Sequence, residues 1–256
     1  MDSKMELSIK DKLCEIERKE NVRIIYAAES GSRAWGFASP DSDYDVRFVY
    51  VRPLEDYLKL EKTRDVIESQ LDEVYDISGW DLQKTLRLLY NSNPTVFEWA
   101  GSPIVYRDSE DWQRVRGLMG RFFKEKTMIL HYLGIAGSHY EKHLKEDMVT
   151  VKKYFYALRP LLCTMWIRDR HTPPPVPFSE LTDSVLPQKL REDVDELVRL
   201  KVAVPETGKI GKVSSLNSFI ESGVSQLKAY ADSLAPAQVP ETAILDDLFV
   251  SLVKHG

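Results

Sequence analysis

Cysteine is scarce in this sequence, and the scarcity excludes two kinds of protein. Cys14 and Cys163 are the only thiols among 256 residues, and they form no CxxC pair. A disulfide framework or a cysteine-based zinc site needs more thiols at closer spacing, so we interpret both as buried thiols in a reducing compartment. No apolar run approaches the roughly 18 residues of a membrane span. The mixed charges of residues 1–20 are not typical of a signal peptide. We therefore expect a cytoplasmic protein.

An excess of positive charge is also missing. The net charge is −5 and the pI about 5.7, so the chain as a whole does not advertise nucleic-acid binding, which would need a local basic surface. Hydrophobic residues make up 43% and charged residues 29% of the chain. This balance is ordinary for a globular protein with a substantial core.

The pattern of apolar residues changes along the chain. An amphipathic helix is expected over residues 4–19, and strands over 22–28, 43–51, 64–69 and 71–80. From Asp81 the period becomes helical, and after a short strand near 103–106 the rest is predicted to be helices, interrupted by the proline cluster HTPPPVPF at 171–178. This segregation predicts an α+β fold with a sheet domain over 1–110 and a helical domain over 111–256.

One stretch, ESGSRAWGFASPDSDYDVRFVY, carries the clearest chemical signal. Asp43 and Asp45 are two apart in a predicted strand, so both should point to the same face of the sheet. Two neighbouring carboxylates repel unless a cation lies between them, and carboxylate oxygens suit Mg²⁺, which also binds phosphate. The Gly31–Ser32 turn offers backbone N–H groups and a hydroxyl to an anion. Together these features indicate a metal-bound triphosphate.

A third acid would complete a site for two-metal phosphoryl transfer. Asp76 lies inside a predicted strand between Tyr75 and Ile77, where a carboxylate without a cation would be costly. Asp81 is the alternative, although it is better explained as the N-cap of the next helix. Each feature alone has a plain structural interpretation, since Gly-Ser is a common turn and PDSDYD a plausible solvated turn. The combination in this order is much more specific.

These residues resemble the active-site signature of the DNA polymerase β-like nucleotidyltransferases. The segments YDISGWDLQKTLRLLYNSNPTVFEWAGSPIVY and KKYFYALRPLLCTMWI further resemble bacterial and phage nucleotidyltransferases associated with RNA-repair gene clusters. The resemblance covers roughly residues 20–185, and the helices beyond it carry no motif that we recognise.

The resemblance implies a role for each matching residue. Asp43 and Asp45 would bind both metal ions, Mg²⁺ or Mn²⁺, and Asp76 the catalytic one. Gly31 and Ser32 would hold the triphosphate of an NTP. The helical domain would close over the nucleotide and is a candidate for holding the acceptor. The residues assigned to the nucleotide in addition are Arg33, Lys152 and Arg159.

The sequence leaves alternatives open for several of these assignments. Lys152 and Arg159 share one flank of a predicted helix with Tyr156, which is equally typical of a solvated helix edge. Arg33 could instead pair with Asp41 or Asp43. The expected reaction is transfer of NMP from the NTP to a hydroxyl with release of pyrophosphate. An RNA end is the first expectation for the acceptor, followed by a protein hydroxyl and a small molecule. The alternative class is a nucleotide- or RNA-binding module without catalysis.

Overall fold

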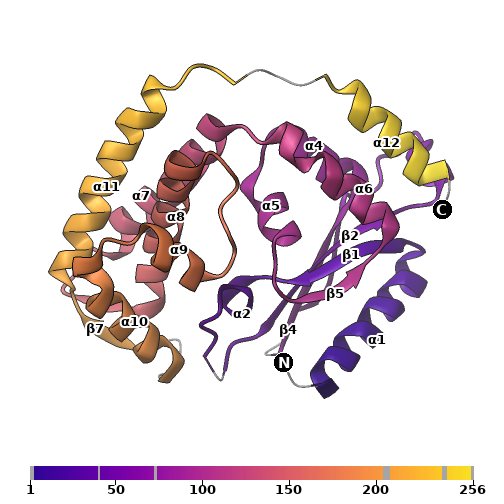
Figure 1. The fold of residues 1–256 in the computed structure, drawn as a ribbon. Helices are drawn as coiled ribbons and strands as arrows, with labels where there is room; N and C mark the ends of the chain where they lie inside the picture. Colours follow the sequence, from indigo (N-terminus) through magenta and orange to yellow (C-terminus); the bar gives the residue numbers. More distant parts are fainter. Residues whose placement is uncertain (1–2, 40, 72–73, 204–207, 238–240, 255–256) are drawn as a thin grey trace. The chain divides into compact units, whose positions relative to one another are not determined.

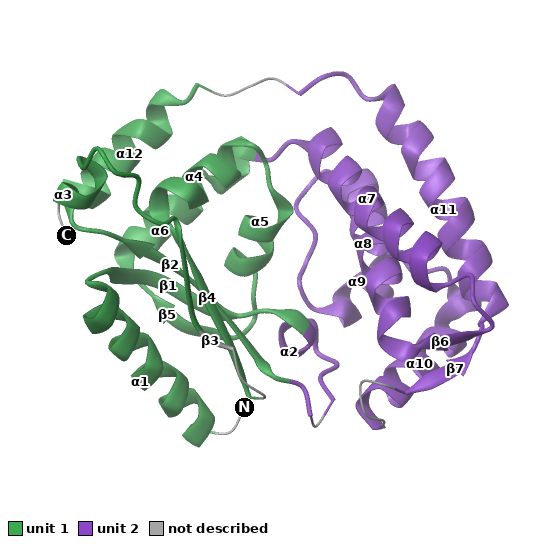
Figure 2. Cartoon of the chain, turned by 180° about the vertical axis from the view of Figure 1, so that it is seen from behind, with its two compact units in different colours: residues 1–31, 43–122, 239–256 green, residues 32–42, 123–238 purple. Residues whose placement is uncertain are grey.

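The structure is a computed structural model, and it describes residues 3–39, 41–71, 74–203, 208–237 and 241–254. It is a mixed α+β chain that divides into two compact units (Figure 2). Unit 1 comprises residues 1–31, 43–122 and 239–256, and unit 2 comprises 32–42 and 123–238. The predicted fold class is confirmed. The units are interleaved along the chain, whereas the sequence pattern suggested one boundary near residue 110.

Unit 1 is built on a five-stranded sheet in the order β3-β4-β2-β1-β5. Strands β1, β2, β4 and β5 are labelled in Figure 1, and β3 is labelled in Figure 2. Strands β2 and β4 are parallel, and the other neighbouring pairs are antiparallel. The strands of the sheet are β1 (Arg23–Glu29), β2 (Tyr44–Val51), β3 (Val66–Leu71), β4 (Tyr75–Asp81) and β5 (Val105–Asp108). The helical segments of this unit are α1 (Ser3–Glu20), α3 (Leu54–Tyr57), α4 (Leu82–Tyr90), α5 (Pro94–Ala100), α6 (Glu110–Leu118), the 3₁₀ helix η1 (Met119–Phe122) and α12 (Ala243–Lys254).

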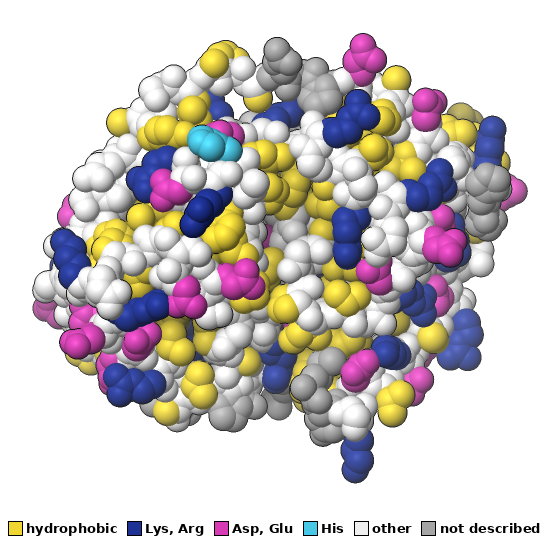
Figure 3. Space-filling model, viewed as in Figure 1, with side chains coloured by type: hydrophobic (Ala, Val, Ile, Leu, Met, Phe, Trp, Pro, Cys, Tyr) yellow, Lys and Arg dark blue, Asp and Glu magenta, His cyan; other side chains and the backbone are white. Residues whose placement is uncertain are grey.

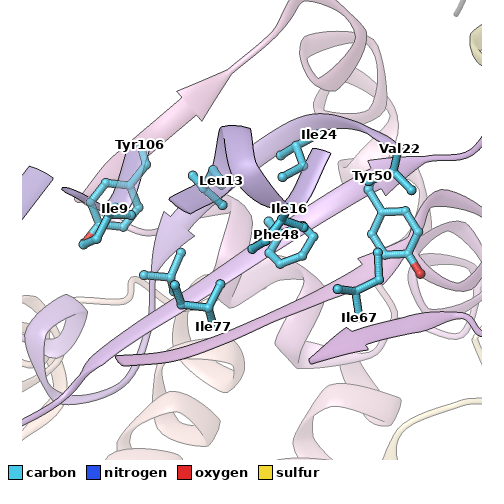
Figure 4. Close-up of a cluster of buried hydrophobic side chains, with 12 residues drawn as sticks. Ile9, Leu13, Ile16, Val22, Ile24, Phe48, Tyr50, Ile67, Ile77 and Tyr106 are labelled. Atoms are coloured by element: carbon cyan, nitrogen blue, oxygen red, sulfur yellow. The ribbon is translucent and has the colours of Figure 1, made fainter. Parts of the chain in front are cut away.

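The core of unit 1 lies between α1 and one face of the sheet (Figure 4). Helix α1 presents Ile9, Leu13 and Ile16 at steps of three and four, and all three side chains are buried. Burial of each such side chain stabilises the fold by about 1.5–3 kcal/mol. From β2 the side chains of Phe48 and Tyr50 enter the same cluster. The alternation predicted for this strand is therefore confirmed, and its other face carries Asp45 and Arg47 near the start of β2 and the buried Val49 and Val51 beyond them.

Unit 2 is mainly helical. Its helical segments are α7 (Glu125–His143), α8 (Val151–Arg170), α9 (Phe178–Val185), the 3₁₀ helix η2 (Gln188–Leu190), α10 (Arg191–Ala203) and α11 (Ser214–Ser233), and α2 (Gly31–Trp35) begins at the last residue of unit 1. The purely helical prediction for this half was wrong in one detail, because β6 (Met148–Thr150) and β7 (Lys209–Gly211) form an antiparallel pair. Val149 is buried in that pair, so a segment that we predicted as the start of a helix is extended instead.

The predicted strand 71–80 is represented by β4, and its residues 72–73 lie outside the described residues. Among the described helices, none is long and apolar enough to cross a membrane. Basic and acidic side chains are interspersed over the face shown in Figure 3. This agrees with the mixed charge of the sequence.

Candidate active site

The two acidic strands predicted from the sequence are direct neighbours in the sheet. In the parallel β2–β4 pair, Asp45 lies opposite Asp76. Asp43 immediately precedes β2, which begins at Tyr44 rather than at Asp43 as predicted. Because side chains alternate along a strand, Asp45 and Asp76 share the face opposite the α1 core. The sheet register therefore brings these two acids together, and Asp43 is close enough to raise the pKa of the Asp45 carboxyl.

A cation already lies between two of these carboxylates. The guanidinium of Arg47 donates through Nη2 to Asp45 Oδ1 at 2.9 Å and to Asp76 Oδ2 at 2.6 Å. Its Nη1 also donates to the backbone carbonyl of Asp76 at 2.8 Å. Strand alternation puts Arg47 on the same face as Asp45, but no sequence motif assigned it a role. Its position, two residues after Asp45 on the same strand, is what brings it between the acids.

The surroundings of Asp45 oppose its negative charge. Burial is the main cause that raises the pKa of its carboxyl to about 6; Asp43 and Asp76 raise it further, while Arg47 lowers it. At neutral pH the group is still mostly ionised, and an additional cation would favour the ionised form. A divalent ion that prefers oxygen ligands therefore fits this donor set. Among the described residues no three acidic, His or Cys side chains converge as a ready-made metal cage, and the guanidinium of Arg47 lies between Asp45 and Asp76.

Gly31 is required here by space as well as by backbone conformation. Its φ is +58°, and a β-carbon on it would overlap the carboxylate Oδ2 of Asp45. The adjacent Ser30 N–H donates to the Asp45 carbonyl at 2.8 Å. The predicted Gly-Ser turn and the acidic strand are thus in direct contact at Gly31 and Asp45.

Glu29, which no sequence motif singled out, supports the acidic strand β2 through a hydrogen bond to its backbone. This glutamate ends β1, and its side chain is only 1% exposed. Oε1 accepts from the Asp45 backbone N–H at 2.9 Å, and Oε2 accepts from the Tyr106 hydroxyl. A charged residue at the end of an apolar strand was the available signal, but its partners were not visible in the sequence.

Asp81 lies at the other end of the same strand pair and has a structural role. It pairs with Tyr50, five positions along β4 from the Asp45–Asp76 pair. Its carboxylate caps α4 by accepting from the Gln83 N–H at 2.7 Å, and it also accepts from the Tyr57 hydroxyl at 2.8 Å. The predicted N-cap is confirmed. Asp81 therefore lies away from the other three acids.

The remaining predicted residues belong to unit 2. The Ser32 hydroxyl donates to Ser42 Oγ at 3.3 Å, and Arg33 donates to the Ser42 carbonyl at 2.5 Å. Lys152 is in the first turn of α8 and partly exposed. The Arg33 alternatives involving Asp41, Asp43 or phosphate stay predictions.

Arg159 differs from a solvated helix edge. Its side chain is 3% exposed, and its guanidinium lies 4.6 Å from the ring of Trp35 in α2. Tyr156 meets the same ring edge-on, with centroids 6.3 Å apart. This flank of α8 is therefore packed against Trp35 of α2. The prediction of a solvated helix edge is wrong for Arg159.

Comparisons with known proteins establish the family. The family described as RlaP, RNA repair pathway DNA polymerase beta family, matches residues 5–251. The chain is 38% identical over 253 residues to the uncharacterized protein YcgL of Bacillus subtilis (strain 168), with 98% of this chain and 97% of the relative covered. The chain belongs to the RlaP family, which places it among the polymerase β-like nucleotidyltransferases.

A solved structure gives a weaker likeness. The nucleotidyltransferase-like protein from Exiguobacterium sibiricum 255-15 is 14% identical, with 88% of this chain and 75% of that chain covered and a TM-score of 0.29. The family match and the Bacillus relative show the family of the chain.

Proposed function

We propose that this protein transfers a nucleoside monophosphate from an NTP to a hydroxyl group at an RNA end. The observation that carries the proposal is the pairing of Asp45 with Asp76 across two parallel strands, with one cation between them. Gly31 lies directly against the carboxylate of Asp45, with no room for a side chain between them. The family description supports the RNA acceptor, and the class of enzyme supports the NTP.

The acids would hold Mg²⁺ or Mn²⁺. A divalent ion bound by Asp43, Asp45 and Asp76 would stabilise charge on the phosphate oxygens and lower the pKa of the attacking hydroxyl. The acceptor oxygen forms a bond to the α-phosphorus, the bond to pyrophosphate breaks, and the hydroxyl proton leaves to solvent.

The basic and small residues would bind the triphosphate. Gly31 would offer its backbone N–H to a phosphate at the start of α2, and the Ser32 hydroxyl is a donor beside it. The guanidinium and ammonium groups that would contact the remaining phosphate oxygens are those of Arg33 and Lys152. Arg159 is 3% exposed and would act through its charge rather than by contact.

The test is incorporation of labelled NTP with Mg²⁺ into total RNA, a protein mixture and small alcohols, assayed in parallel. We expect label in RNA, loss of label in EDTA, and loss in Asp45→Ala. Asp81→Asn is the matched control, because it changes an acid of the same strand pair outside the site and should keep transfer. Label found only in protein or only in alcohols would show that the acceptor is a protein or a small molecule and not RNA. Full incorporation by Asp45→Ala would overturn the proposed mechanism.

A further inference from the structure

A cavity of about 580 Å³ opens on the same face of the sheet as the acids. Its lining includes Asp76 and Ser78 from β4, Glu68 from β3, and Thr95 and Trp99 from α5. Every lining residue belongs to unit 1. Ligand sites commonly measure about 300–1,000 Å³, so the cavity can hold a small organic group directly beside Asp76.

An aromatic surface forms one wall of this cavity. Trp80 of β4 and Trp99 of α5 have ring centroids 3.9 Å apart, at an angle of 33°. Trp99 is 4% exposed, whereas Trp80 is partly exposed. Trp80 therefore has indole surface left for a ligand. Planar rings, nucleobases above all, stack well on such a surface.

The spacing along β4 matches an elongated ligand. Asp76, Ser78 and Trp80 alternate onto one face of the strand, so Trp80 lies about 13 Å along the strand from Asp76 at the usual rise per residue. Ser78 lies midway between them, and Glu68 is its cross-strand partner on β3. Hydroxyl and carboxylate groups thus lie between the acid and the aromatic wall, where they can contact the edge of a base.

The charge of the lining favours an uncharged portion of the acceptor. Among the described residues that line the cavity, Arg47 is the one cation, and it contacts Asp45 and Asp76. A triphosphate in this cavity would be repelled by Glu68 and Asp76, and the described lining residues include no cation besides Arg47 to offset that repulsion. A terminal nucleoside carries no charge, and the phosphates of the preceding chain would stay outside.

We propose that this cavity binds the terminal nucleoside of the acceptor, with its base on Trp80 and its reacting hydroxyl at Asp76. The inference rests on the proposed function, and it names the part of the acceptor that is recognised. It also gives unit 1 a direct part in binding the acceptor, which the sequence had led us to expect of the helical domain.

The experiment compares the full-length wild type with Trp80→Ala, Trp80→Phe and Glu68→Ala. Michaelis constants are measured separately for a short single-stranded RNA with a 3′ hydroxyl and for the NTP, and equilibrium dialysis measures binding of each of the four labelled nucleosides. Trp166→Ala is the matched control, because Trp166 is a partly exposed tryptophan of α8 that does not line the cavity. Glu68 is exposed on the edge strand β3, so its variant should fold even if Trp80→Ala does not.

We expect Trp80→Ala to raise the Michaelis constant for RNA by roughly 5- to 150-fold, the usual loss of one stacked base. Trp80→Phe should recover most of this loss, Glu68→Ala should raise the constant severalfold, and the constant for NTP should not change. Unchanged RNA constants in Glu68→Ala and in folded Trp80→Ala, together with no nucleoside binding by the wild type, would overturn the inference. So would a rise confined to the Michaelis constant for the NTP.

The two proposals fail differently. If the wild type transfers nothing to any acceptor, the proposed function is wrong, and dialysis of nucleosides still tests the cavity. If transfer to RNA occurs but none of the cavity variants affects it, only the cavity assignment is wrong.

Discussion

Replacing Arg47 should show that the carboxylates of Asp45 and Asp76 need a cation between them. Arg47→Met removes the guanidinium but keeps an apolar stem of similar length. The variant loses charge-assisted hydrogen bonds to Asp45 and Asp76, whose side chains are 23% and 27% exposed, against 18% for Arg47. Such bonds contribute about 1.5–3 kcal/mol each, and partial exposure reduces their value. We therefore expect the free energy of unfolding in EDTA to fall by about 2–4 kcal/mol.

The assay is urea denaturation with and without millimolar Mg²⁺, in the absence of nucleotide. Mg²⁺ should change the wild type little, because Arg47 already neutralises the pair, and it should restore much of the loss in Arg47→Met. Arg107→Met is the matched control, since Arg107 pairs with Glu17 in the same unit at similar exposure. No recovery with Mg²⁺, or equal recovery in both variants, would refute our interpretation of the acidic pair.

The further predictions concern Asp81, Glu29 and Lys152. Asp81→Ala should lower the free energy of unfolding by about 1–3 kcal/mol, because it removes the α4 cap and leaves the half-buried Tyr57 hydroxyl without its acceptor. Asp81→Asn should keep the cap through its amide oxygen, and its NH2 group can donate to the Tyr57 oxygen instead of accepting from it. Burial raises the pKa of Asp81, so wild-type stability should fall relative to Asp81→Asn as pH rises above the ordinary aspartate range, and parallel urea curves at pH 4 and pH 7 check this sign. Glu29→Ala should lower stability by about 1–3 kcal/mol by leaving the Asp45 N–H unsatisfied, and it should slow turnover, whereas Glu29→Gln should lose much less; equal stability of all three proteins would contradict the supporting role. Lys152→Ala should weaken NTP binding measured by calorimetry without unfolding the protein, and unchanged affinity would remove Lys152 from the nucleotide site.

The sequence was most informative where local pattern decides structure. Alternation in β2 predicted which side chains enter the core and which carry the acids, and the change of period at Asp81 predicted the cap of α4. Neither signal depends on distant parts of the chain, because strand alternation and helix capping are local properties.

Features that depend on tertiary pairing could not be predicted in this way. Nothing local shows that β2 and β4 are parallel neighbours, so the contact between Arg47 and Asp76 was not visible. Glu29 has the sequence context of an ordinary strand end, and its hydrogen bonds to the Asp45 N–H and the Tyr106 hydroxyl appear only in the folded chain. Arg159 has the spacing of a solvated edge, and its burial follows from Trp35, more than a hundred residues earlier in the chain. Long-range contacts decided each of these cases.

The most direct test of the central claim is turnover and NTP affinity of Asp76→Asn, with Asp81→Asn as the control of the same chemical change. Asp43 and Asp45 remain to hold the nucleotide's metal ion, so NTP affinity should stay close to that of the wild type. Turnover should fall by about two orders of magnitude or more, because activation of the attacking hydroxyl is lost. Asp81→Asn should keep both. Near wild-type turnover by folded Asp76→Asn, or a comparable loss in Asp81→Asn, would contradict the assignment of Asp76 as the third acid.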